Sequence, residues 1–260
     1  MPTRLRVDLA GYHHIINRGV NRCDIFNSTH DKEMFLQILN KSATIHKAIV
    51  HDYCLMDNHY HILLETSKDN LSALMRVINA NYAKYFNKKY KRSGHLWQDR
   101  YKSKYIISDN YLYILLRYIE NNPLEASMAT KVCEYPYTLS YLLFNAKPYY
   151  PCCNDSILIK EFDLKTLNEF LGEPISEDEL EYLKAKEKQK IFKKDNEIEI
   201  AQSKEFLEHF YETDTKTKRN LAILHAYKDG YPQVKIAMHL KLSTSMVSKI
   251  IKSGYSITGV

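Results

Sequence analysis

The chain has 260 residues, of which 45% are hydrophobic and 26% charged, and its formal net charge is +6. This length accommodates a core domain and a smaller module, and the composition argues against a globally disordered chain. The five cysteines form no CxxC pair, and no apolar run reaches the length of a membrane span. We therefore expect a cytoplasmic protein without a cysteine zinc site, a disulfide framework or a membrane partner.

The first half of the chain predicts alternating strands and helices. The expected strands are residues 11–17, 48–56, 59–65 and 101–108, and the expected helices are residues 30–47, 71–86 and 110–122. Asp57 and Asn58 suit a tight turn between the second and third strands, and Pro123 should stop the last helix at the preceding residue. This order predicts an α+β fold, a ferredoxin-like antiparallel sheet with helices.

The second half predicts a connecting segment and then a small helical module. Residues 130–160 contain prolines and few periodic cues, and residues 160–210 are rich in acids and lysines, as in solvated helices. Three helical patterns follow at 218–228, 232–240 and 243–252, which resemble a helix-turn-helix. We expect a catalytic domain over 1–140, a mostly helical connection over 141–210 and an all-α C-terminal DNA-binding module over 211–260.

Two details of this tail bear on the helix-turn-helix prediction. Pro232 can open the middle helix, and Ser243 can cap the third one. Lys241, however, stands where such turns usually carry glycine. A plain helical bundle is therefore the alternative.

Positive charge is concentrated in residues 76–104, which contain nine basic side chains and one acidic side chain, Asp99. Such a run is often only a solvated helix face. Aromatic side chains within it change the balance, because basic grooves with stacking rings hold unpaired nucleic acid. Core packing can still account for some of these rings, which are Tyr82, Tyr85, Phe86, Tyr90, Trp97 and Tyr101.

His59 and His61 lie two residues apart on an expected strand, so their side chains project from the same face. Two neutral imidazoles on one face can converge on a divalent metal ion and leave positions open for phosphate oxygens. A pair of structural histidines is the commoner explanation of this pattern.

Tyr118 is one of 21 tyrosines, and its spacing suits a buried helix face equally well. A catalytic role is suggested by Asn122, which lies one helical turn later on the same face and carries a carbonyl oxygen for a metal. A free phenol has a pKa of about 10, so a nucleophilic tyrosine needs positive charge nearby.

Four stretches in a fixed order resemble the REP-associated tyrosine transposases, part of the single-strand nucleases with a His-hydrophobic-His motif and one catalytic tyrosine. They are YHHIINRGVNR with IF at 25–26, then MDNHYHILLE, GHLWQDRYKSK and LLRYIENNPLEA, all between about residues 10 and 140. The sequence departs from the pattern twice. Tyr60 is bulkier than the usual aliphatic middle residue, and Asn122 stands where insertion-sequence relatives have Gln.

The resemblance implies a transposase, a metal-dependent single-stranded DNA endonuclease and strand transferase. It implies that His59, His61 and Asn122 hold Mg²⁺ or Mn²⁺ and that Tyr118 forms a 5′-phosphotyrosine. The substrate is expected to be single-stranded DNA folded as a hairpin. Relatives of this kind include monomers and homodimers, so both states stay open.

Further residues are expected to contact DNA. In the core, basic side chains are candidates for phosphate contacts and Trp97 for stacking on a base. In the tail, residues near the start of the third helix are placed for the groove of a duplex. The two sets are Arg18, Trp97, Gln98, Arg100, Lys102 and Lys104 in the core, and Thr244, Ser245, Ser248 and Lys249 in the tail.

Two other functions compete with this one. A transposase-derived regulator would bind DNA through the tail without cutting it, but the intact His59, His61 and Tyr118 argue against it. A metal-dependent hydrolase of small substrates is disfavoured by the basic aromatic stretch and by the lack of an evident general base.

Overall fold

The computed structural model describes residues 8–187, 191–194, 197–200, 210, 215–228, 236–237 and 239–257. The chain divides into two compact units, Met1–Leu183 and Lys184–Val260. The first unit contains a four-stranded sheet, and the second contains a two-stranded sheet and the helices of the tail. Within the described ranges, no helix is both long and apolar enough to cross a membrane.

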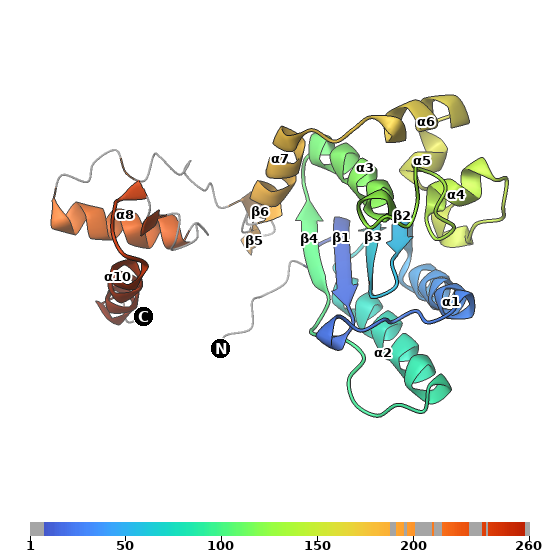
Figure 1. Ribbon diagram of the computed structural model, residues 1–260, viewed down its shortest axis with the longest axis horizontal. Coiled ribbons are helices and arrows are strands. Elements are labelled where there is room, and N and C mark those ends of the chain that lie inside the picture. The colour runs from blue at the N-terminus through green and yellow to red at the C-terminus, as the bar shows by residue number, and fades with distance from the viewer. Residues whose placement is uncertain are drawn as a thin grey trace. The chain divides into compact units, whose positions relative to one another are not determined.

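The four-stranded sheet is antiparallel throughout, with the strand order β2-β3-β1-β4 (Figure 1). Between its strands lie two long helices, so the chain runs strand, helix, strand, strand, helix, strand, helix. This confirms the predicted α+β, ferredoxin-like arrangement. The bounds are β1 Gly11–Arg18, α1 Thr29–His46, β2 Ala48–Leu55, β3 His59–Thr66, α2 Leu71–Lys89, β4 Lys102–Ile106 and α3 Asp109–Glu125, with a short 3-10 helix at Val20–Arg22.

Helices cover both faces of this sheet, α1 and α2 on one and α3 on the other (Figure 1). Successive side chains of a strand point to opposite faces, and β3 shows which helix each face meets. The Tyr60 ring lies 4.8 Å from the ring of Phe35 on α1. The neighbouring His61 ring lies 5.8 Å from the ring of Tyr118 on α3. One strand therefore supplies side chains to two separate environments.

The predicted end of the last core helix at Asn122 is wrong. α3 continues to Glu125 with Pro123 inside its final turn. Proline has no N–H to donate to the Ile119 carbonyl four residues earlier, which is why proline usually ends a helix. Here the side-chain Nδ2 of Asn122 donates to the carbonyls of Tyr118, at 2.6 Å, and Ile119, at 3.5 Å. The asparagine amide replaces the missing backbone donor.

The segment after α3 folds onto the same core, so it is more than a solvated connection. Its helices are α4 Leu139–Phe144, a 3-10 helix at Pro151–Cys153, α5 Ile157–Lys160, α6 Leu164–Gly172 and α7 Glu177–Glu187. Among their residues, Leu139, Leu158 and Leu171 are buried with the side chains of the central sheet.

The second unit contains a hairpin and a separate helical core. The hairpin, β5 Ile191–Lys194 and β6 Glu197–Ile200, lies in a region predicted to be mostly helical. Helices α8 Lys216–Lys228 and α10 Thr244–Ile257 bury apolar side chains such as Ile223 and Val247. Pro232, the expected start of the middle helix, lies outside the described residues. The helix-turn-helix therefore stays a prediction.

Two predicted features of the tail do have a structural counterpart. The Ser243 hydroxyl accepts a hydrogen bond from the backbone N–H of Met246 at 3.2 Å, as expected of a residue that caps α10. Lys241 has a φ of 53°, the left-handed conformation that glycine adopts most easily. Lys241 therefore adopts the backbone conformation that glycine usually has in such turns.

Candidate active site

Three histidines form a cluster on the sheet face that α3 covers. β3 carries His59 and His61, whose ring centroids are 5.2 Å apart with planes inclined at 74°. His14 of β1 stacks on His61 at 5.2 Å, and its Nε2 lies 2.9 Å from Nδ1 of His61. The two expected metal ligands are thus neighbours, and a third imidazole, that of His14, contacts His61. We name His14, His59 and His61 the histidine cluster.

The sequence interpretation missed His14. It lies 47 positions from His61 in the chain and meets it only through the β1–β3 pairing. The available signal was its place on the expected strand in the His13-His14 pair, at the position that alternates onto the same face as Ile16.

Tyr118 lies against the histidine cluster from α3. Its ring is 5.8 Å from the His61 ring and 6.5 Å from the His14 ring, nearly perpendicular to both. Asn122 is one turn further along the same helix, and its Nδ2 bonds the Tyr118 carbonyl. Because Nδ2 is used within the helix, the carbonyl oxygen of this amide is the atom suited to a metal ion.

Burial keeps the three imidazoles neutral. It lowers the pKa of His59 to about 4, and the positive charge of Arg18 lowers it further. Burial likewise lowers the pKa of His14 to about 3, with help from Lys104. The pKa of His61 falls well below its usual value because of burial and the neighbouring His14 and His59. A neutral imidazole is the form that binds metal ions.

Hydrogen bonds decide which ring nitrogen of each ligand is available. Nδ1 of His59 lies 2.6 Å from Oδ1 of Asn58, which can only accept, so Nδ1 carries the proton and Nε2 keeps its lone pair. Between His14 and His61 only one nitrogen donates. If His61 donates through Nδ1, its Nε2 lone pair is also free for a metal ion, whereas donation by His14 would leave a proton there.

These donors fit a divalent ion that also takes oxygen ligands. Across the described residues, no group of three or more His, Cys, Asp or Glu side chains is arranged as a metal site. The candidate donors are the two imidazoles of His59 and His61 and the carbonyl oxygen of Asn122. Such a set leaves coordination positions for phosphate oxygens.

Three of the expected DNA-binding residues lie on the strands beside the cluster. Arg18 pairs with His59 across β1 and β3, and Lys104 pairs with His14 across β1 and β4. Lys102 is exposed two residues earlier on β4. Lys104 is half-buried, and its Nζ donates to the Leu183 carbonyl at 3.2 Å. Lys104 therefore has a packing role in addition to its charge.

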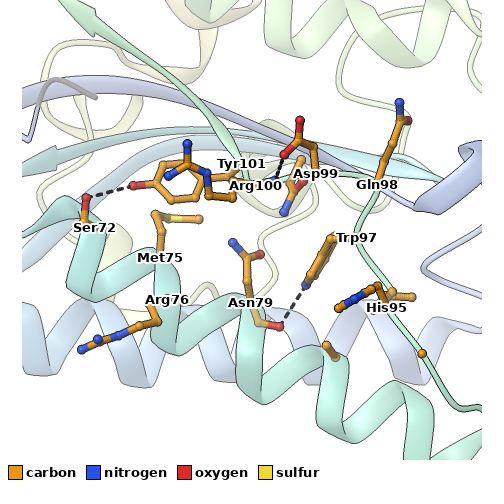
Figure 2. Close-up of a pocket in the computed structure, with 14 residues that line it drawn as sticks. Ser72, Met75, Arg76, Asn79, His95, Trp97, Gln98, Asp99, Arg100 and Tyr101 are labelled. Carbon is orange, nitrogen blue, oxygen red and sulfur yellow. Dashed lines mark hydrogen bonds between the residues drawn. The ribbon is translucent and has the colours of Figure 1, made fainter. Parts of the chain in front are cut away.

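The other three, Trp97, Gln98 and Arg100, line a pocket that α2 borders, on the opposite side of the sheet (Figure 2). The backbone N–H of Gln98 donates to the Arg18 carbonyl at 2.9 Å, which ties this segment to the end of β1. Trp97 is half-buried, and its Nε1 donates to the Asn79 carbonyl at 3.0 Å. The structure thus splits the predicted DNA contacts of the core into two groups.

Core packing accounts for most rings of the basic aromatic stretch. Tyr82 and Phe86 are buried. Tyr85 and Tyr90 donate hydrogen bonds to the buried carboxylate of Asp31, at 2.9 and 2.6 Å. These four rings therefore hold α2 against α1, and of the six rings only Trp97 and Tyr101 line the pocket.

In the tail, the expected duplex contacts lie at the start of α10. Ser245 and Lys249 are exposed, and Ser248 is half-buried. Thr244 is the first residue of the helix.

Comparison with known proteins gives one family and eight solved chains, two of which are described below. The sequence model of the family described as "Transposase IS200 like" matches residues 9–122, which contain the histidine cluster, Tyr118 and Asn122. A solved REP-associated tyrosine transposase bound to a REP hairpin is 18% identical, with 68% of this chain and 99% of that chain covered and a TM-score of 0.46. A putative transposase from Deinococcus radiodurans R1 is 20% identical, with 46% and 96% covered and a TM-score of 0.34. No curated protein matches the chain.

Proposed function

The IS200-like transposase model matches residues 9–122, and from that match we propose that this chain is a member of the family and acts as a metal-dependent single-stranded DNA endonuclease and strand transferase. The observation that carries the proposal is the position of Tyr118, whose ring lies 5.8 Å from that of His61 within the histidine cluster. A nucleophile beside two neutral metal-binding imidazoles is the arrangement that phosphoryl transfer to tyrosine needs.

In the proposed reaction, the Tyr118 oxygen attacks the scissile phosphorus in line, and its proton passes by way of solvent to the departing 3′-oxygen. A bond forms between tyrosine and the 5′-phosphate, and the bond to the 3′-oxygen breaks, which releases a 3′-hydroxyl. Attack by another 3′-hydroxyl on the phosphotyrosine reverses the exchange and rejoins DNA. Each step replaces one phosphodiester bond with another, so no external energy source is required.

His59, His61 and Asn122 are the proposed ligands of Mg²⁺ or Mn²⁺. When bound, the ion supplies Lewis-acid polarisation of the scissile phosphate. The hydrogen bond from His59 Nδ1 to Asn58 leaves the Nε2 lone pair of that ring for the ion. The proposed His61 tautomer donates through Nδ1 to His14, which leaves its Nε2 lone pair for the ion as well. Such partners of metal ligands orient the ring and select its tautomer.

Arg18 and Lys102 are the proposed phosphate contacts beside the histidine cluster. Both belong to strands that border it, and Arg18 pairs with His59 in the sheet. Phosphate contacts position a strand without reading its sequence. We further propose that the core takes hairpin DNA, that Thr244, Ser245, Ser248 and Lys249 contact duplex DNA, and that the protein works as a monomer or homodimer.

The test is a covalent-adduct assay with a labelled hairpin oligonucleotide drawn from the DNA beside the gene. Wild-type protein, Tyr118→Phe and Tyr113→Phe are each incubated with it and Mn²⁺, then run on a denaturing gel. Tyr113 is a matched control, because it lies on the same helix and its hydroxyl donates to Glu161. We expect a slow-migrating adduct with wild type and Tyr113→Phe only.

Two results would contradict the proposal. An adduct that persists in Tyr118→Phe would move the nucleophile to another residue. DNA binding without cleavage or adduct, with every divalent metal tried, would favour the non-cleaving DNA-binding regulator instead.

A further inference from the structure

A pocket of about 680 Å³ opens between α2 and residues 94–101, on the sheet face away from the histidine cluster (Figure 2). Its volume lies in the range of small-molecule sites, about 300–1,000 Å³. The proposed cleavage chemistry uses none of its lining residues. Its chemistry therefore needs a separate explanation.

One wall of the pocket contains a buried amide whose donor is poorly satisfied. Asn17 of β1 is only 5% exposed and lines the pocket. Its Oδ1 accepts the backbone N–H of Arg18 at 3.0 Å, which settles which end of the amide is oxygen. Its Nδ2 is buried and faces the Tyr60 hydroxyl without completing a hydrogen bond of standard geometry. Buried donors are rarely left so poorly satisfied, so this one points to an acceptor that the pocket receives.

A second amide on the wall is oriented by Tyr60. The Tyr60 hydroxyl donates to Oδ1 of Asn79 at 2.8 Å, so Nδ2 of Asn79 is the donor that remains. The aliphatic residue usual at this position of the histidine motif could not make that bond. The tyrosine at position 60 thus supplies a hydrogen bond to the pocket wall, on the face away from the histidine cluster.

The remaining surface combines flat apolar walls with a cationic rim. Met75, Trp97 and Tyr101 supply the walls, and the side chains of Arg76 and Arg100 are exposed at the rim (Figure 2). The one acid there, Asp99, accepts the backbone N–H of Arg100 at 2.7 Å. A ligand that matches these features has a flat ring with hydrogen-bond acceptors and carries a negative charge.

We propose that this pocket binds one unpaired nucleotide of the DNA strand on which the histidine cluster acts. The base lies between the apolar walls with its acceptor atoms toward Asn17 and Asn79, and its phosphate lies at Arg76 or Arg100. The inference rests on the proposed function and deepens it. Asn17 directly precedes Arg18, which pairs with His59, so both sites lie at the same end of β1, where one DNA strand is proposed to pass.

An abasic scan tests this placement. Tyr118→Phe protein, which cannot cut, is titrated into labelled hairpin oligonucleotides in which each unpaired nucleotide in turn lacks its base. Binding is measured by fluorescence anisotropy. We expect one position at which loss of the base weakens binding by about 5- to 150-fold, the range for stacking of a single base.

The same scan in a second variant decides whether that base sits in the pocket. Asn17→Asp, made in the Tyr118→Phe background, turns this donor into an acceptor at nearly constant shape. It should weaken binding of the intact oligonucleotide, and removal of the sensitive base should then have no further effect. Asn145→Asp is the control for charge, since Asn145 is exposed on α4's C-terminal side and outside the pocket.

Tyr60→Phe guards against misfolding of the Asn17 variant. It keeps the buried ring and removes only the hydroxyl that orients Asn79. The loss of binding on removal of the sensitive base should become smaller in this variant, while thermal melting stays cooperative. The proposal would be overturned if, in both variants and at every position, the binding loss from the substitution and the binding loss from removal of the base were independent. Free nucleoside monophosphates that bind the pocket while no position couples to Asn17 would overturn it as well.

The covalent-adduct assay keeps this proposal separate from the proposed function. An adduct in wild type together with no coupled position would refute the nucleotide pocket and leave the Tyr118 chemistry intact. A coupled position with no adduct would establish the pocket and remove the nuclease assignment.

Discussion

The two faces of β3 differ in chemistry although they share one strand. On the α3 face, His59 and His61 are neutral imidazoles beside the Tyr118 ring. On the α2 face, Tyr60 holds an amide at the wall of a pocket. The first face suits a metal ion and a nucleophile, and the second suits a flat ring with acceptors.

This difference shows how one strand can position two sites at once, the histidine cluster on one face and the pocket on the other. A shift of one residue in the pairing of β3 would exchange its two faces, so the register that places the histidines also places Tyr60. The pairs Asn17 with Tyr60 and Arg18 with His59 show the same division on β1. Variants on the two faces should therefore have separable effects.

The largest expected effect comes from two single substitutions, one on each face of β3. His61→Ala removes a proposed metal ligand and should slow Mn²⁺-dependent adduct formation by about 10²- to 10³-fold, with DNA binding retained. Tyr60→Phe should weaken DNA binding and still form the adduct at saturating DNA. Gel-based rates and anisotropy measure the two effects. Equal losses of both activities in both variants would show that the faces are not independent.

Neighbouring asparagines on α3 give the next comparison. Asn122 and Asn121 each donate a side-chain hydrogen bond to the carbonyl four residues earlier, at 2.6 and 2.8 Å. Either alanine variant should lose about 0.5–1.5 kcal/mol of unfolding free energy in urea titrations.

Only Asn122→Ala should also weaken Mn²⁺ binding, by about tenfold or more in calorimetry, because its carbonyl oxygen is a proposed ligand. Unchanged Mn²⁺ affinity in Asn122→Ala would leave the asparagine with its helical role alone.

Adjacent histidines on β1 test the role of His14. His14→Leu removes the hydrogen-bond partner of His61 and should lower Mn²⁺ affinity by about tenfold. His13→Leu is the control, because His13 is equally buried but faces the other way, where its Nε2 lies 2.7 Å from the Leu9 carbonyl. If both variants lowered the affinity to the same extent, general destabilisation rather than ligand orientation would explain the loss.

The smallest expected effect is a dependence of stability on pH. The pKa of His59 in the folded state is about 4, below the ordinary value of 6.5, so the unfolded chain binds more protons below about pH 6.5. Stability should therefore fall as the pH is lowered from about 6.5 toward 4. His59→Gln should remove roughly 1 kcal/mol of the loss between pH 7 and 5.5.

Urea midpoints at the two pH values measure this contribution, and His30→Gln, at an exposed position on α1, serves as the control. An identical pH dependence in wild type and His59→Gln would show that His59 is not held neutral by the fold.

Local sequence determined most of the fold and part of the site. Helical and strand periodicity located the core elements to within a few residues, and the Asp57-Asn58 turn set the β2–β3 hairpin. The same periodicity put His59 and His61 on one face and Asn122 one turn after Tyr118. These features depend on neighbours in the chain, so the sequence contains them directly.

Tertiary structure alone decided the rest. The bond from His14 to His61 spans 47 positions, and that from Tyr60 to Asn79 links a strand to a helix. The division of the basic stretch between a packed core and a pocket also depends on which residues face α1 and β1. Even the continuation of α3 through Pro123 needed the Asn122 side chain to bond the carbonyls behind it. Such contacts arise from strand register, burial and side-chain geometry, which local patterns do not encode.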